Sequence, residues 1–407
     1  MSEIINNSEL RKETIKSILE KLHKGSSIEE VKEEFERTFN GVTPSEISEA
    51  EQALIAEGME VSEIQKLCDV HAAVFKGSVL DIHNTENLEK IQGHPVYALK
   101  LENRELERII DERIIPKLKT MEEEDGISEL KEALRELGKL NLHYIKKENI
   151  IFPLLESHGI EAPPKVMWGV DDEIRAFWKR ILMEDNNLII DLKTFEENII
   201  SLCDKVKEMI FKEENILVPM LAEKLTEEEW RSIDAESREL GFIVDEMPEW
   251  KRSLNLSSST SSSHETVKEE LTSGIITTPT GTFTPQELVA VLNALPFDIT
   301  FVDKDDRVKY FSEGKERMFT RTKSAIGRKV SNCHPPASVH IVEAIVEDLR
   351  SGRKDHEDFW IRLGDKFALI RYFAVRDEKG EYLGVLEITQ DIKPIQEIEG
   401  EKRLASK

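Results

Sequence analysis

The feature that most constrains the fold of this chain is a short helical pattern that occurs twice. Residues 143–153 read HYIKKENIIFP, and 66 positions later residues 209–219 read MIFKEENILVP. Each copy interleaves ionisable and apolar residues at spacings that fit one buried helical stripe ending near a proline. The repeat therefore predicts a duplicated helical hairpin.

Alignment of the two copies on their prolines shows what they share and where they differ. The matched pairs are Lys146 with Lys212, Glu148 with Glu214, Asn149 with Asn215 and Ile150 with Ile216. His143 of the first copy stands opposite Met209 of the second. Facing helices of a bundle can aim imidazoles and carboxylates into a common interior and bind metal there. A His near a Glu on an amphipathic helix is more often a satisfied boundary pair, so the repeat alone leaves both interpretations open.

The apolar periodicity around the repeat predicts a bundle of four helices. They are expected over about residues 95–119, 128–155, 171–192 and 194–221. We expect Pro163 and Pro164 to mark the loop between the two hairpins, because adjacent prolines disfavour helix before and within themselves. The segment 226–229, TEEE, is a capping-box pattern that predicts a short final helix.

Composition limits the classes of function. The 407-residue chain holds 81 Asp and Glu against 56 Lys and Arg, and its net charge of -25 would repel nucleic acid and anionic membranes. No segment approaches the roughly 20 apolar residues of a membrane span, and the first residues lack the apolar run of a signal peptide. Three widely spaced cysteines argue against a disulfide framework. We expect a cytoplasmic protein with no nucleic acid partner and no membrane span.

The pattern changes twice in the C-terminal part of the chain. Residues 251–282 are rich in Ser and Thr and lack the apolar content to pack, which predicts a flexible linker. After Pro285 a helix leads into two β-rich runs, FDITFVD and VKYFS, then a helical segment, and then three more runs, HEDFWIRL, FALIRYFAVRD and YLGVLEITQDI. This order resembles a PAS domain, a single antiparallel sheet with helices over one face.

The region of the repeat resembles a hemerythrin-like (HHE cation-binding) four-helix bundle. The resemblance is carried by His143, Glu148 and the Phe152-Pro153 ending, together with an earlier His94-Pro95 that opens a helix. Upstream, EISEAEQALIAEGMEVSEIQKLCDVHAAVFKG resembles an uncharacterised helical domain that precedes such bundles. The resemblance implies a multidomain chain, mainly α and then α+β. Its expected parts are an N-terminal helical domain (1–82), the hemerythrin-like bundle (83–250), the linker (251–282) and a PAS domain (283–407).

The same resemblance implies a metal site. Members of the hemerythrin family hold a non-haem di-iron centre with His, Glu and Asp side chains from four helices. Carried over to this sequence, the implied ligands are His94, His143, Glu148, Asp171 and Glu214, with Glu102 and Glu213 as weaker candidates. Iron is the implied cofactor, in a di-iron, mixed or mononuclear site.

The sequence departs from the family pattern at three positions. Asp171 stands where the family usually has a His, and Met209 replaces another expected His. Lys147 stands four after His143, where several relatives have a ligating Glu. Five residues of α-helix rotate by about 140°, so His143 and Glu148 are not both expected at the centre of the interior face. We expect one better and one poorer half-site, and a hydrogen-bonded polar layer without metal is the alternative.

In the PAS-like region the candidate ligand-pocket residues are Cys333, His334 and His340. A PAS pocket can hold haem through one axial His, which would make a gas or redox sensor. The alternative is that residues 332–336 form a rigid turn before the long helix, with His334 fixing the backbone.

Three functions follow from these patterns. The first is a sensory protein whose bundle binds iron and responds to oxygen, nitric oxide or redox state, with output through an unknown protein partner or a homodimer. The second is a metal-free helical interaction module beside a ligand-sensing PAS domain. The third is a di-iron oxidoreductase that acts on oxygen or nitric oxide. No catalytic residue is predicted, and we favour a non-enzymatic function.

Overall fold

The computed structural model describes residues 88–121, 125–183, 192–251, 274–315 and 317–400, together with residues 17, 20, 21, 53 and 58. The chain divides into two compact units, one made of the region up to residue 251 and the other of most of the residues after it. Apart from the five single positions, the expected N-terminal helical domain (1–82) lies outside the described residues, as do residues 252–273 of the expected linker.

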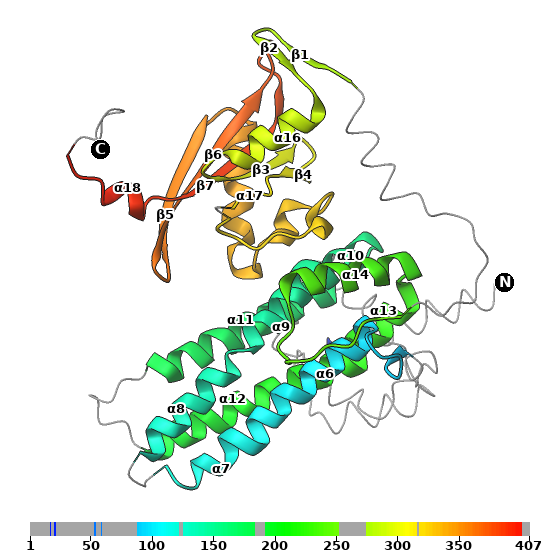
Figure 1. The fold of residues 1–407 in the computed structure, drawn as a ribbon, viewed down its shortest axis with the longest axis vertical. Helices are drawn as coiled ribbons and strands as arrows, with labels where there is room; N and C mark the ends of the chain where they lie inside the picture. Colours follow the sequence, from blue (N-terminus) through cyan, green and yellow to red (C-terminus); the bar gives the residue numbers. More distant parts are fainter. Residues whose placement is uncertain are drawn as a thin grey trace, which may run out of the picture. The chain divides into compact units, whose positions relative to one another are not determined.

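The helical unit contains, within the described residues, four long helical rods that run side by side (Figure 1). Rod A is formed by α6 (Pro95–Arg108), η1 (Ile109–Ile114) and α7 (Ile115–Leu118). Rod B is formed by α8 (Gly126–Leu137), α9 (Leu140–Lys146), η2 (Lys147–Ile151) and α10 (Phe152–Ser157). Rod C is α11 (Ala162–Met183), and rod D is formed by α12 (Leu192–Lys212), η3 (Glu213–Leu217) and α13 (Val218–Lys224). The predicted final helix is α14 (Glu227–Leu240), which begins with a capping box at Thr226.

A π-helical turn precedes a proline in three of the rods, counted over the residues that the structure describes. These turns are η1, η2 and η3, and the prolines that follow them are Pro116, Pro153 and Pro219. Proline has no N–H to donate, and in an α-helix its ring clashes with the carbonyl four residues earlier. The wider π turn relieves this clash. In the repeat the turns hold the segments KENII and EENIL, so the prolines set the geometry of the ionisable residues.

Two expectations about rod C are wrong. α11 begins at Ala162, so Pro163 and Pro164 lie in its first turn and not in a loop between two hairpins. Residues in a first turn need no intrahelical partner for their N–H, and the fixed φ of proline suits a helix there. Asp171, expected near the start of this helix, therefore lies well inside it and is fully buried, at 0% exposure.

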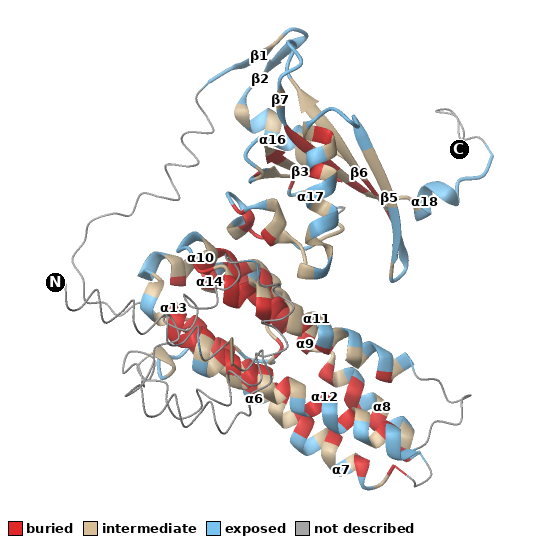
Figure 2. Cartoon of the chain, turned by 180° about the vertical axis from the view of Figure 1, so that it is seen from behind, coloured by how far each residue is buried: buried red, intermediate tan, exposed pale blue. Residues whose placement is uncertain are grey.

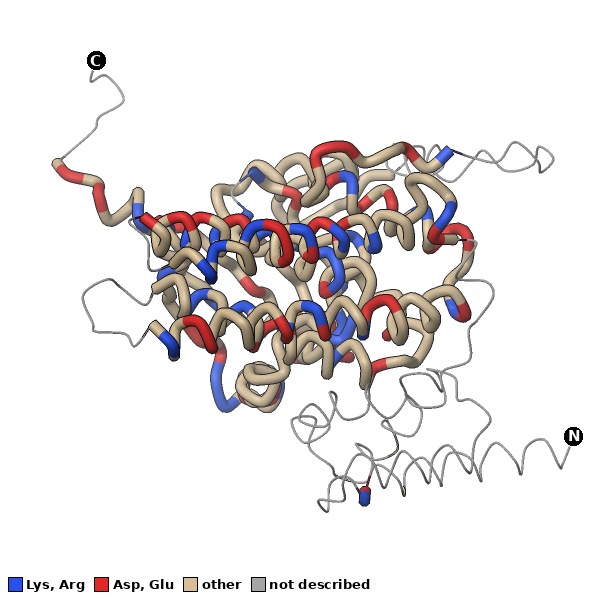
Figure 3. The backbone as a smooth tube through the Cα atoms, turned by 90° about the horizontal axis from the view of Figure 1, so that it is seen from below, with Lys and Arg blue, Asp and Glu red and all other residues tan. Residues whose placement is uncertain are grey.

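The rods pack around an apolar core, whose buried faces are drawn in red in Figure 2. The core contains Leu99, Leu106, Ile110, Leu134, Leu137 and Ile174, with Phe177 packed against it. Acidic and basic positions are interspersed along the same helices instead of forming blocks of one sign (Figure 3). None of the helices in the described segments combines the length and apolar character needed to cross a membrane.

The sheet unit has the predicted order of two strands, helices and three strands. Within the described residues it contains a five-stranded antiparallel sheet with strand order β4-β3-β7-β6-β5. The strands are β3 (Asp298–Asp303), β4 (Val308–Phe311), β5 (His356–Leu363), β6 (Lys366–Arg376) and β7 (Tyr382–Asp391). The helices are α16 (Pro285–Ala294), η4 (Lys323–Ala325), η5 (Val330–Cys333), α17 (Pro336–Arg350) and α18 (Lys393–Gln396). Val385 packs against Val346 and Leu349, so α17 covers one face of the sheet.

The end of the expected linker differs from the prediction. β1 (Ile276–Thr278) and β2 (Gly281–Phe283) pair as an antiparallel hairpin within residues that were expected to be a flexible tether. The hydroxyl of Thr278 donates to the carbonyl of Gly281 at 2.9 Å and fixes the turn. The β-branched residues on either side favour extended backbone, even though the segment offers little apolar surface to bury.

The sheet tolerates a side chain poorly at Gly384. Its φ is +149°, and an added Cβ would lie 2.1 Å from the carbonyl oxygen of Val302 on the neighbouring strand. We expect Gly384→Ala to destabilise the sheet unit by about 3 kcal/mol, because backbone atoms of β3 would have to move. Gly380→Ala is the matched control, since its φ is +85° but nothing lies within 4 Å of the added Cβ. It should cost about 1 kcal/mol. Calorimetric unfolding of the full chain measures both losses, and equal losses would contradict the close approach at Gly384.

Candidate functional site in the helical bundle

A cluster of ionisable side chains lies in the interior of the bundle, where all four rods contribute to it. Its members are Glu102 of rod A, His143, Lys146, Lys147 and Glu148 of rod B, Asp171 and Arg175 of rod C, and Glu213 of rod D. Seven of the eight are buried residues, and the Arg175 side chain is 15% exposed. We call this set the ion cluster.

His143 is held by carboxylates on both sides. Its Nδ1 lies 2.8 Å from Oε2 of Glu102, and its Nε2 lies 3.0 Å from Oε2 of Glu213. Burial by itself would lower the pKa of His143, but the charges and hydrogen bonds of Glu213 and Glu102 outweigh burial and raise the pKa to about 9. The imidazole is therefore protonated at neutral pH, and both ring nitrogens donate.

Lys147 occupies the centre of the cluster. Its ammonium donates to Oδ1 of Asp171 at 2.9 Å and to Oε1 of Glu213 at 2.5 Å. It also lies 4.4 Å from the centroid of the Tyr144 ring. Lys147 and Glu213 are equivalent positions in the two copies of the repeat, each six residues before the final proline. The duplicated motif has thus brought a cation and an anion face to face.

Two further cations complete the cluster. Lys146 donates to Oε1 of Glu102 and lies 4.5 Å from the centroid of the Phe242 ring. Arg175 donates to Oε1 of Glu148 at 2.6 Å and to Oδ1 of Asp172 at 2.5 Å. The carboxylates of the cluster thus have cationic partners that belong to the chain itself.

The charges of the cluster balance. Fully ionised, its four carboxylates face four cationic groups, namely two lysines, one arginine and the protonated His143. Burial raises the pKa of Glu148 to about 8 and that of Asp171 to about 6, and the charges of Arg175 and Lys147 partly offset this rise. The cluster therefore carries no excess negative charge that would require a divalent cation.

The residues present do not fit a hemerythrin-like metal centre. Both ring nitrogens of His143 are engaged by carboxylates, and the Lys147 ammonium lies against Asp171 and Glu213. Two buried polar atoms of the site, Oδ2 of Asp171 and the Tyr144 hydroxyl, have no hydrogen-bond partner in the part of the chain that the structure describes. One carboxylate oxygen and one phenol are too few ligands for an iron centre. No group of three or more His, Cys, Asp or Glu side chains arranged to hold a metal occurs among the described residues.

Two of the candidate ligands from the sequence lie outside the ion cluster. His94 is the N-cap of α6, where its Nδ1 accepts from the backbone N–H of Val96 at 3.1 Å. It packs against the rings of Trp230 and Trp250, and burial lowers its pKa to about 4. Eight residues, or about 12 Å of helix, separate it from Glu102. Glu214 accepts from Arg104 of rod A, at 2.6 Å and 2.8 Å.

His143 and Glu148 are both buried, at 3% and 4% exposure, but they face different rods. His143 contacts Glu102 of rod A and Glu213 of rod D, whereas Glu148 contacts Arg175 of rod C. This agrees with the expectation that the two side chains do not share the centre of one interior face.

The cations of the cluster were missed as site residues. Lys147 was noticed only as a departure from the family pattern, and Lys146 and Arg175 were given no role in the site. A signal was nevertheless present, because Lys147 falls four residues after His143, on the same face of the helix. A lysine on an interior face needs a buried acid as partner.

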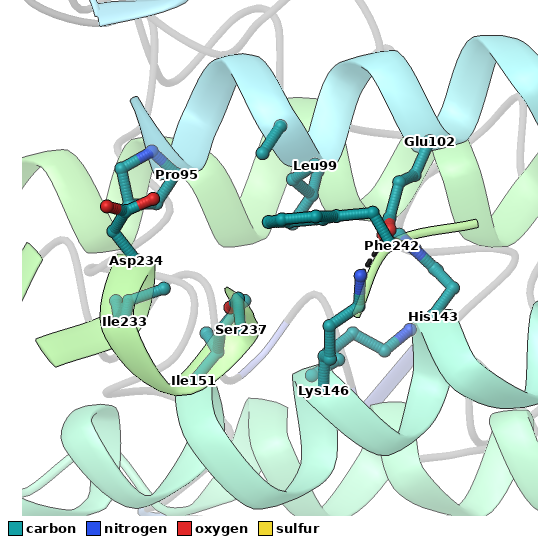
Figure 4. Close-up of a pocket in the computed structure, with 12 residues that line it drawn as sticks. Pro95, Leu99, Glu102, His143, Lys146, Ile151, Ile233, Asp234, Ser237 and Phe242 are labelled. Atoms are coloured by element: carbon teal, nitrogen blue, oxygen red, sulfur yellow. Dashed lines mark hydrogen bonds and ion pairs between the residues drawn. The ribbon is translucent and has the colours of Figure 1, made fainter. Parts of the chain in front are cut away.

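A small pocket opens toward one side of the cluster, as Figure 4 shows. Its cavity volume is about 30 Å³, room for little more than one water molecule. Leu99, Ile151 and Phe242 form apolar walls, and Glu102, His143 and Lys146 lie together at one end. Glu102, His143, Lys146 and Lys147 of the ion cluster thus line this pocket.

The three candidate residues in the sheet unit lie in η5, directly after it and on α17. The Nδ1–H of His334 donates to the carbonyl of Val330 at 2.8 Å, as in the rigid-turn interpretation. The thiol of Cys333 is 3.5 Å from the carbonyl of Lys329. His340 is exposed on α17.

Comparisons with known families agree with this architecture. Residues 94–221 match the model of the hemerythrin HHE cation binding domain, residues 288–393 match a PAS domain, and residues 15–81 match a family of unknown function, DUF438. These matches confirm the predicted order of an uncharacterised N-terminal domain, a hemerythrin-like domain and a PAS domain. No curated protein matches the chain.

Three solved structures are similar over part of the chain. A C-terminal domain from Streptococcus mutans is 38% identical, with 31% of this chain and 99% of that one covered and a TM-score of 0.30. A PAS domain from Colwellia psychrerythraea is 18% identical, with 27% and 97% covered and a TM-score of 0.23. A sensory box sensor histidine kinase from Vibrio cholerae is 14% identical, with 26% and 90% covered and a TM-score of 0.21. With TM-scores this low, we draw no functional conclusion from the three.

The ion cluster predicts a large loss of stability when Lys147 is removed. Lys147→Ala leaves Asp171 and Glu213 facing each other without their shared cation, at an expected cost of about 3–5 kcal/mol. Lys193→Ala is the control, because the Lys193 side chain is 78% exposed, and it should cost less than about 0.5 kcal/mol. Denaturant unfolding measures both.

A second change separates lost charge balance from lost packing. Adding Glu213→Gln to Lys147→Ala removes one anion together with one cation, so it should restore at least about 1 kcal/mol. If the double variant shows the plain sum of the two single losses, Lys147 and Glu213 are not coupled.

Proposed function

Because this chain joins a hemerythrin HHE cation binding domain to a PAS domain, we propose that it is a sensory protein whose bundle works without metal. In this proposal the PAS domain receives the signal, and the bundle serves as a helical interaction module that passes the signal to a protein partner. The iron-dependent sensor suggested by the sequence is the competing proposal.

The observation that carries the metal-free proposal is the position of Lys147. Its ammonium binds Asp171 and Glu213, two of the residues that the resemblance assigns to metal. A cation fixed to the chain thereby joins rods B, C and D, which is the structural role that a metal ion has in related bundles. His143 joins the remaining rod through Glu102.

The proposed output is a contact with another protein. The net charge of -25 disfavours nucleic acid as a partner. A second copy of the chain is one such partner, and sedimentation of the full chain would detect a homodimer. An oxidoreductase would need open coordination positions on a metal. The engagement of both nitrogens of His143 disfavours it.

The metal content of the purified protein tests the proposal. Full-length protein prepared anaerobically is expected to contain no stoichiometric iron by plasma emission, and His143→Ala should leave the metal content unchanged. A di-iron centre would instead give about two irons per chain, lost in His143→Ala, and that result would establish an iron sensor or enzyme.

The variant Lys147→Glu tests whether the Lys147 ammonium prevents metal binding. This variant replaces the ammonium by a carboxylate beside Asp171 and Glu213, so we expect binding of added Fe²⁺ or Mn²⁺ to increase at least about tenfold. Lys193→Glu, with the same charge change at an exposed position, is the control and should bind as weakly as the original protein. Equal metal binding by both variants would show that Lys147 does not determine metal affinity.

A further inference from the structure

The inner face of the PAS sheet is apolar at one end and polar at the other. Along β7, Val385, Glu387 and Thr389 point to the same side, because side chains alternate along a strand. Val385 packs against α17, which identifies this side as the helix-covered face. Asp298 of β3 is the cross-strand partner of Thr389 and lies on the same face. Glu387, Thr389 and Asp298 are all buried, at 7%, 0% and 6% exposure.

Two arginines contact the carboxylates at this polar end. One of them is hydrogen-bonded to its carboxylate and the other is not. Arg321 donates to both carboxylate oxygens of Glu387, at 3.1 Å and 3.4 Å. Arg317 lies 4.9 Å from the centroid of the Phe311 ring and 3.6 Å from Oδ1 of Asp298. Among the described residues, neither terminal nitrogen of Arg317 has a hydrogen-bond partner. The guanidinium of Arg317, whose side chain is 20% exposed, thus keeps donors without a hydrogen-bond partner at this end of the sheet.

Two further unpaired polar atoms lie on the same end of the sheet as this guanidinium. Oδ1 of Asp298 and Oγ1 of its cross-strand partner Thr389 are buried without a hydrogen-bond partner in the described part of the chain. Each belongs to a residue that is more than nine-tenths buried. Buried polar groups are nearly always paired, and leaving one unpaired costs about 1–3 kcal/mol. Several unpaired groups gathered at one place indicate a bound molecule that supplies the missing partners.

The charges select the chemical class of that molecule. A guanidinium fork takes a carboxylate in two parallel hydrogen bonds, and the nearby Asp298 takes a donor, best a cationic one. The two arginines already balance Asp298 and Glu387, so a simple anion would leave the buried site with a net negative charge. A molecule with adjacent carboxylate and ammonium groups can bind both Arg317 and Asp298, and it adds no net charge.

We propose that the PAS domain binds a free α-amino acid, with the ligand carboxylate on Arg317, the ligand ammonium on Asp298, and Thr389 completing the hydrogen bonds. The site lies at the polar end of the inner sheet face. This inference rests on the proposed sensory role of the PAS domain and gives the signal a chemical class. It does not depend on the absence of metal from the bundle.

Thermal unfolding and titration calorimetry of the full chain with the twenty common L-amino acids test the proposal. At least one amino acid should bind and raise the Tm of the sheet unit by about 3 °C or more at saturation. Acetate, which offers only the carboxylate, and methylamine, which offers only the ammonium, should each bind at least tenfold more weakly. Binding of acetate as tight as that of the amino acid would overturn the zwitterion assignment, and no binding by any amino acid would overturn the proposal.

Substitutions test where the ligand binds, and they test whether a loss of binding is caused by unfolding. Arg317→Gln and Asp298→Asn should each weaken binding at least tenfold, whereas Arg353→Gln, at a side chain that is 57% exposed, should leave binding unchanged. Without ligand, Arg317→Lys should unfold near the temperature of the original protein, because it keeps a cation beside Asp298, and it should bind the amino acid at least tenfold more weakly, because it lacks the planar fork of donors. A lower Tm would make Arg317 a structural residue and overturn its assigned role.

Failure of the amino-acid proposal can be distinguished from failure of the metal-free proposal for the bundle. Iron in the bundle would refute the metal-free proposal and leave amino-acid binding intact, because the two sites lie in different domains. If no amino acid binds, the proposed ligand class is refuted. The measured metal content of the bundle still tests the metal-free proposal.

Discussion

The ammonium of Lys147, bound between Asp171 and Glu213, is the interaction on which the interior of the bundle depends. Burying this many charges is unfavourable unless each finds a partner, and the partners here come from different rods. Lys147 joins rods B, C and D, and His143 links rods A, B and D through its two carboxylates. The chain therefore achieves with its own side chains the cross-linking that a metal ion gives to related bundles. The same contacts hold both ring nitrogens of His143 against carboxylates.

The prolines explain why these side chains can meet. Pro153 and Pro219 each follow a π turn, and the turns carry Lys147 and Glu213 at equivalent positions of the repeat. A duplicated hairpin brings equivalent positions together across the bundle. Once one copy has a lysine there and the other a glutamate, the pairing is attractive, whereas two glutamates at these positions would repel each other unless a cation lay between them.

The two domains solve the problem of buried charge in different ways. In the bundle, the ammonium and guanidinium groups of the ion cluster have carboxylate partners within the chain. In the PAS domain, Arg317 and Asp298 lie close together yet leave donors and acceptors unpaired among the described residues. Local violations of hydrogen-bond pairing concentrate where a protein does its work. The sheet domain is therefore the better place to look for a ligand, and the bundle for a mechanical role.

The sequence by itself determined the domain order, the four-rod bundle, the order of strands and helices along the PAS-like region and the capped start of α14, because periodicity and capping are local properties of the chain. It also pointed to His143, Glu148 and Asp171 as interior residues. It misplaced Pro163 and Pro164, and it placed His94 in a site from which about 12 Å of helix separates it, because neighbours in space are not encoded by spacing along one helix. Only the tertiary structure decided that Lys147 and Arg175 neutralise the buried acids and that Arg317 lacks partners. Whether a buried charge is satisfied depends on which side chains from distant segments reach it.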